Sequence, residues 1–142
     1  MIKILLVEDS KFLRLATERA LARAGYEVST AADGEEAVTK ARENLPDLIL
    51  LDLLLPKLTG TDVLKALKKD PATKKIAVVV LTGMSHRNED WLRRDGAFGF
   101  LGKAELALDK GAGTLLAAVA EFVKQLHLDI PASAARSRRA GI

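Results

Sequence analysis

The chain has 142 residues, with 22 Lys or Arg against 19 Asp or Glu, and its formal net charge is +3. This length suits one domain with a single hydrophobic core, and the lack of cysteine excludes disulfides, thiolate metal sites and a cysteine nucleophile. The N-terminal apolar run is too short for a secretory leader, and no apolar run approaches the roughly 18 residues of a membrane span. We therefore expect a cytoplasmic protein without membrane contact.

The basic isoelectric point of about 9.3 arises mainly from the C-terminal end. Residues 128–142 carry net +2 of the total charge, from Arg136, Arg138, Arg139 and Asp129. The remainder is nearly neutral, and its few aromatic residues do not form the basic, aromatic-rich surface that nucleic-acid binding needs. After Pro131 no apolar periodicity remains, so the sequence predicts one domain at 1–127, a disordered basic tail at 128–142, and no nucleic-acid partner.

Strand-type and helix-type segments alternate along the chain. Apolar runs at 2–7, 48–51 and 76–81 suit strands that are buried on both faces, as in a parallel sheet. The segments between them repeat apolar residues every three or four positions, as amphipathic helices do. In chain order we expect strand 2–7, helix 11–24, strand 27–31, helix 34–44, strand 47–52, helix 61–69, strand 76–82, a weaker helix near 87–94, strand 97–101 and a helix at about 113–127.

Local signals support these helices. The first helix follows the cap candidate Ser10 and should end at Gly25; its expected inner face is Leu13, Ala16, Ala20 and Ala24. The second should end before Pro46, with an inner face formed by Ala37, Val38, Ala41 and Leu45. Five strands that alternate with five helices predict a doubly wound α/β fold around a five-stranded parallel sheet.

Polar residues follow several of the predicted strands. Glu8 and Asp9 follow the first strand, Asp52 ends the third, Thr82 ends the fourth and Lys103 follows the fifth. In an open parallel sheet, ligands bind beyond the carboxyl ends of the strands. Three carboxylates at one edge repel each other unless a proton or a cation intervenes, and hard oxygen ligands favour Mg²⁺. A carboxylate in such a site can act as a nucleophile towards phosphorus.

The spacing of these residues resembles the receiver domain of bacterial two-component response regulators, in particular the single-domain, chemotaxis-regulator-like kind. The resemblance covers residues 1 to about 127. The motifs that carry it are Leu-Val-Glu-Asp-Ser at 6–10, Leu-Leu-Asp at 50–52, Leu-Pro-Lys-Leu-Thr-Gly at 55–60, Leu-Thr-Gly at 81–83, and Lys103. It implies a flavodoxin-like sheet with strand order 2-1-3-4-5 and a phosphorylation switch rather than a metabolic enzyme.

The resemblance also implies roles for individual residues. Asp52 matches the phosphoacceptor, while Glu8, Asp9 and the backbone carbonyl of Leu54 match the ligands that hold Mg²⁺ with it. Thr82 matches the switch hydroxyl, Lys103 the phosphate-pairing lysine and Phe100 the switch aromatic residue. The implied partners are a sensor histidine kinase or a histidine phosphotransfer protein, and a downstream protein that binds the last two helices and the fifth strand.

Two features depart from the family pattern. Ala104 follows Lys103 where family members usually have proline, so the geometry of that peptide is open. Residues 104–112 make a long connection to the last helix, which either reshapes the partner-binding face or is a tolerated insertion.

Leu54 and Met84 should flank the path of the water that hydrolyses the acyl phosphate, and because both are apolar we expect a long-lived phosphorylated state.

Three alternatives differ in what they require. A haloacid-dehalogenase-type phosphatase needs an aspartate two residues after the nucleophile, where this chain has Leu54. A flavodoxin-like electron carrier needs a glycine- and hydroxyl-rich phosphate loop after the first strand, whereas Glu8 and Asp9 would repel a phosphate there. A third possibility, a receiver that belongs to a longer regulator with 128–142 as the start of a linker, stays open.

Overall fold

The computed structural model describes residues 1–53, 55, 58–82, 93–102 and 113–126. Five parallel strands form one sheet in the order β2-β1-β3-β4-β5, as the resemblance implied. The strands are β1 (Lys3–Val7), β2 (Glu27–Ala31), β3 (Leu48–Asp52), β4 (Ala77–Thr82) and β5 (Gly99–Gly102), and the helices are α1 (Lys11–Arg23), α2 (Gly34–Asn44), α3 (Gly60–Lys69) and α5 (Gly113–Gln125).

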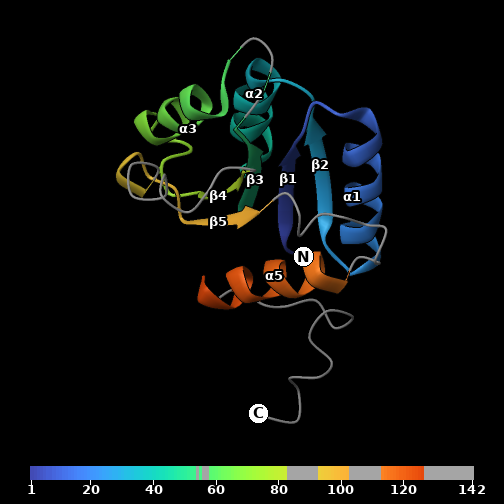
Figure 1. The fold of residues 1–142 in the computed structure, drawn as a ribbon. Coiled ribbons are helices and arrows are strands. Elements are labelled where there is room, and N and C mark those ends of the chain that lie inside the picture. Colours follow the sequence, from blue (N-terminus) through green and yellow to red (C-terminus); the bar gives the residue numbers. More distant parts are fainter. Residues whose placement is uncertain (54, 56–57, 83–92, 103–112, 127–142) are drawn as a thin grey trace.

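Helices cover both faces of the sheet, so the molecule has three layers (Figure 1). Alternate residues of the inner strands enter two separate cores. Ile4, Leu6 and Leu50 pack against α1 and α5, whereas Leu5 and Leu51 pack against α2 and α3. This two-sided burial explains why the strands read as continuous apolar runs.

The predicted elements agree with the observed ones to within about two residues, which is the usual uncertainty of an element's ends. Most of the weak helix expected near 87–94 lies outside the described residues, as does the tail at 128–142. No helix in the described part of the chain is long and apolar enough to cross a membrane.

The inner faces of two helices differ from the prediction. On α1 the buried residues are Thr17, Ala20 and Leu21, so the helix is rotated towards Leu21 and away from Leu13. Leu45, expected in the core, is 53% exposed and has a left-handed backbone (φ 45°) at the end of α2. A residue before proline avoids the helical region, so Pro46 ends the helix and Leu45 turns outward.

The ends of α1 follow their sequence signals. The Ser10 hydroxyl accepts a hydrogen bond from the Leu13 N–H at 3.3 Å and caps the first turn. At the other end, Gly25 has φ 103°, a conformation that favours glycine because a Cβ would be strained there. The chain thereby leaves α1 and enters β2 with the register that places β2 beside β1.

Candidate metal and phosphoacceptor site

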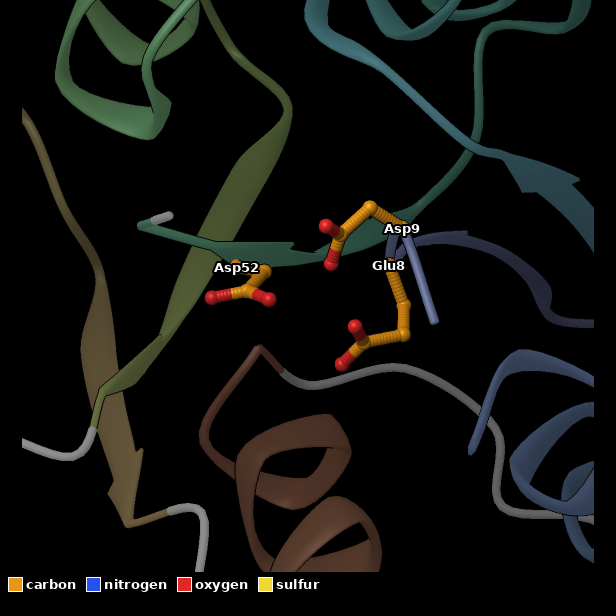
Figure 2. Close-up of side chains that lie close together, drawn as sticks. All are labelled: Glu8, Asp9 and Asp52. Carbon is orange, nitrogen blue, oxygen red and sulfur yellow. The ribbon is translucent and has the colours of Figure 1, made fainter. Parts of the chain in front are cut away.

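The predicted acids come together at the carboxyl ends of two neighbouring strands. β1 and β3 pair in register, with Val7 opposite Leu51, so Glu8 and Asp9 emerge beside Asp52. One carboxylate oxygen from each of the three acids lies within 4.8 Å of the others. Figure 2 shows the three side chains gathered around a common space at this edge of the sheet. The topology, rather than any local loop motif, therefore assembles the cluster.

The three acids differ in exposure, and the difference suits a metal site. Glu8 is 2% exposed and Asp52 1% exposed, whereas Asp9 is exposed to solvent. Burial and mutual repulsion both disfavour three negative charges here, so a bound cation would be favourable. The donors are all carboxylate oxygens, which are the ligands of Mg²⁺ and Ca²⁺ rather than of softer metals. The residues present therefore fit a hard divalent cation.

Hydrogen bonds fix the loop that carries the acid pair. The Glu8 N–H donates to the carbonyl of Ala31 at 3.0 Å and so ties the end of β1 to β2. The Glu8 side chain accepts, through Oε2, a bond of 3.0 Å from the Ser10 N–H. These contacts hold the Glu8 carboxylate against the first turn of α1, where the positive end of the helix dipole also favours it.

Arg14 makes a contact that the sequence did not predict. Its Nη1 donates to the backbone carbonyls of Glu8 at 3.0 Å and of Asp9 at 3.3 Å. A signal was present, because side chains on a helix point back towards its N-terminus, and Arg14 is the fourth residue of α1. The same direction places its guanidinium over the loop before the helix.

The other predicted site residues are placed only in part. Thr82 ends β4. Because Asp52 pairs with Leu81, the backbone of Thr82 lies next to the backbone of Asp52. Phe100 is half-buried on β5 against the core that α2 and α3 cover, and the guanidinium carbon of Arg93 lies 4.9 Å from its ring centroid. Lys103, Leu54 and Met84 lie outside the described residues, so their predicted roles stay predictions.

The fold and this site together define a class of protein. A sheet of order 2-1-3-4-5 reverses its winding between β1 and β3, and in such folds ligands bind at this reversal. The acidic cluster occupies that position, because Glu8 and Asp9 follow β1 and Asp52 ends β3. The chain is thus a flavodoxin-like α/β domain whose acidic cluster at the reversal fits a cation rather than an anion.

Comparison with known proteins gives the family. Residues 4–110 match the response regulator receiver domain, and the chain belongs to this family. It is 41% identical over 110 residues to the gliding motility regulatory protein of Myxococcus xanthus, covering 76% of this chain and 14% of that protein. It is also 41% identical over 87 residues to the response regulator PleD of Caulobacter vibrioides, covering 61% of this chain and 19% of PleD. The chain therefore spans less than a fifth of either relative.

A solved structure matches nearly end to end. The chemotaxis response regulator CheY4 of Vibrio cholerae superposes with a TM-score of 0.77 at 34% identity, and the match covers 86% of this chain and 98% of that one. The family, the strand order and the CheY-like architecture that the sequence suggested are thereby confirmed.

Proposed function

We propose that this domain is a phosphorylation switch in which Asp52 accepts a phosphoryl group with the help of Mg²⁺. The observation that carries the proposal is the cluster of Glu8, Asp9 and Asp52, with carboxylate oxygens within 4.8 Å of one another, at the switch point of the sheet. Membership of the receiver family supports the same reading. The product is a signalling state, although the domain would catalyse its own phosphorylation and hydrolysis.

The chemistry follows from the nature of the groups. An Asp52 carboxylate oxygen attacks the phosphorus of a phosphohistidine, the P–N bond breaks, and the imidazole nitrogen leaves with the electron pair and takes up a proton. Glu8, Asp9, Asp52 and the Leu54 carbonyl would hold Mg²⁺, which would neutralise charge on the phosphoryl oxygens. Lys103 and the Thr82 hydroxyl would donate to the same oxygens.

The phosphodonor we propose is a sensor histidine kinase or a histidine phosphotransfer protein, which would meet the domain in the cytoplasm. One observation supports a protein donor. Phe12, in the first turn of α1 and three residues after Asp9, is 78% exposed, and Leu15 on the next turn is 38% exposed. An exposed apolar pair in the first turns of the helix that follows Glu8 and Asp9 suits contact with a helical protein. Phe12→Ser should slow transfer from such a donor and leave labelling by a small phosphodonor unchanged.

The output we propose is a change in the surface of the last two helices and β5. Thr82 would move towards the phosphoryl group and Phe100 would repack inward. Phe100 has no hydroxyl, so its switch would operate through packing, and Arg93 over its ring favours the present position by roughly 0.5–1 kcal/mol at an exposed site. A downstream protein that binds this surface would sense the difference.

A receiver within a longer regulator remains the alternative, and its output domain would follow residue 142.

The direct test is intact-mass measurement after incubation with a small phosphodonor and Mg²⁺. Wild type should gain one phosphoryl group, and Asp52→Asn should gain none because an amide is a poor nucleophile. Asp62→Asn, an exposed aspartate of α3, is the matched control and should label like wild type. An unmodified wild type at saturating Mg²⁺ with several donors would contradict the proposal.

We also propose that the phosphoryl group persists for many minutes. The two positions that should flank the attacking water, Leu54 and Met84, are apolar and can neither orient nor activate it. Since each 1.36 kcal/mol of barrier is tenfold in rate, a lost orienting contact corresponds to about tenfold slower decay. The double variant Leu54→Asn, Met84→Glu should lose its phosphoryl group about tenfold faster than wild type. Equal or slower decay would refute this explanation.

A further inference from the structure

Asp9 lies in the loop between β1 and α1, and the direction of its side chain depends on the backbone conformation of that loop. Asp9 is exposed, so packing does little to fix its side chain, unlike that of the buried Glu8. The orientation of its Cα–Cβ bond is set by the two peptide groups on either side of its Cα. A device that holds both of these peptides would hold the Asp9 carboxylate in place.

Arg14 makes that contact. The Glu8 carbonyl belongs to the peptide before the Asp9 Cα, and the Asp9 carbonyl belongs to the peptide after it. Arg14 Nη1 donates to both, at 3.0 Å and 3.3 Å, so one guanidinium nitrogen restrains both φ and ψ of Asp9. Arg14 is itself fixed, because it is half-buried and its N–H donates to the Ser10 carbonyl at 2.8 Å.

We propose that Arg14 is a positioning residue for the cation site: it binds no metal, and it holds the backbone of the acid pair in the arrangement that places Asp9 beside Glu8 and Asp52. The inference rests on the proposed Mg²⁺ site. Groups that orient metal ligands without binding the metal themselves affect metal affinity strongly, and their mutation typically weakens it 10–100-fold. Arg14 acts through peptide carbonyls rather than through a ligating side chain, so we expect the lower end of that range.

The sign of the effect separates this role from plain electrostatics. Arg14 is a cation near a site for a cation, so by Coulomb repulsion alone its removal would tighten Mg²⁺ binding. If Arg14 positions the loop, its removal loosens the Asp9 backbone and weakens binding. Arg19 offers a matched control, because it is an exposed arginine of the same helix, and neutralising it changes the net charge equally without touching the loop.

The experiment is calorimetric titration of the full chain with Mg²⁺ alone, on wild type, Arg14→Gln, Arg14→Lys and Arg19→Gln, with metal-free thermal melting as a check of folding. We expect Arg14→Gln to bind Mg²⁺ roughly tenfold more weakly, Arg19→Gln to match wild type within about twofold, and Arg14→Lys, which keeps a donor and the charge, to recover part of the loss. In Arg14→Gln, the half-maximal rate of labelling by a small phosphodonor should require a higher Mg²⁺ concentration than in wild type. The rate at saturating Mg²⁺ should equal the wild-type rate.

Several outcomes would overturn the positioning role of Arg14. Tighter or unchanged binding in Arg14→Gln would overturn the positioning role while leaving the proposed function intact. An equal loss of affinity in Arg19→Gln would make the effect one of net charge and would likewise overturn it. If Arg14→Gln melts below the temperature of the titration, Arg14→Lys carries the test, and wild-type Mg²⁺ affinity in Arg14→Lys would overturn the positioning role. A wild type that binds no Mg²⁺ would remove both the cation site and the role of Arg14.

Discussion

Gly60 sets how closely α3 approaches the strand that ends in the phosphoacceptor candidate. A Cβ at this position would lie 2.4 Å from the Asp52 carbonyl oxygen and 2.5 Å from the Leu53 Cα, whereas carbon atoms in contact are about 3.5–4.0 Å apart. Both obstacles are backbone atoms, which cannot rotate away. In Gly60→Ala, either the start of α3 or the end of β3 must therefore shift by about 1 Å.

The magnitude follows from three contributions. Overpacking of this kind costs typically 1–3 kcal/mol, and the hydrogen bond from the Gly60 N–H to the Leu53 carbonyl, 2.9 Å long, contributes about 1 kcal/mol that the shift weakens. The lower entropy of the unfolded alanine chain offsets about 0.4–1 kcal/mol. The net destabilisation should be about 1–3.5 kcal/mol, or roughly 4–14 °C in melting temperature for a domain of this size.

Thermal denaturation followed by circular dichroism tests this, with Gly113→Ala as the matched control. Gly113 also begins a helix, α5, but no atom of the described residues lies within 4 Å of a Cβ placed there. That variant should melt at or slightly above the wild-type temperature, because alanine favours helix. If Gly60→Ala melted within about 2 °C of Gly113→Ala, a close approach of α3 to β3 could not be what Gly60 provides.

Three further predictions concern the acids and a buried hydroxyl. Glu8→Gln with Asp9→Asn should abolish the rise in melting temperature with Mg²⁺ and raise the metal-free value, since like charges are removed; an undiminished Mg²⁺ response would contradict the site. Tyr26→Phe should raise stability by about 1 kcal/mol in urea denaturation, because the buried Tyr26 hydroxyl finds no hydrogen-bond partner among the described residues; a loss would show that it has one. The hydrogen bond from the Ala72 N–H and the Arg42 contact lower the pKa of Asp70, so Asp70→Asn should lower the melting temperature slightly at pH 7, and the difference from wild type should vanish as pH falls below the lowered pKa.

The sequence predicted the fold and the acidic cluster because both depend on strong, simple patterns. Strands buried on two faces need continuous apolar runs, and Asp52 at the end of such a run is conspicuous. The order of strands then brings Glu8 and Asp9 beside it whatever the surrounding loops do. The family motifs added predicted roles for residues such as Lys103 and Thr82, which periodicity alone could not suggest.

Two features could not be predicted from the sequence: the buried face of α1, which depends on how the helix is rotated, and the Arg14 contact, which involves backbone acceptors. The apolar spacing on α1 allowed Leu13 to face inward, but the packed helix buries Thr17 and Leu21 instead, and Phe12 is left in solvent. A stripe pattern fixes a face only to within about one residue, so tertiary packing decides the rest. The Arg14 contact was missed for another reason. The direction of helical side chains places Arg14 near the loop before α1, but its acceptors are peptide carbonyls, which residue types do not reveal.

The site joins stability to signalling through its charges. Glu8 and Asp52 are buried beside each other and near Asp9, so the metal-free fold carries a repulsion that the unfolded chain avoids. A cation that binds only the folded state stabilises it by RT ln(1 + [L]/Kd), about 2.7 kcal/mol at a hundred times Kd. The positioning role proposed for Arg14 would hold Asp9 beside the other two acids through the backbone and leave their charge in place. In the proposed function a cation would complete this arrangement, and the same negative charge that costs stability would make phosphorylation of Asp52 depend on that cation.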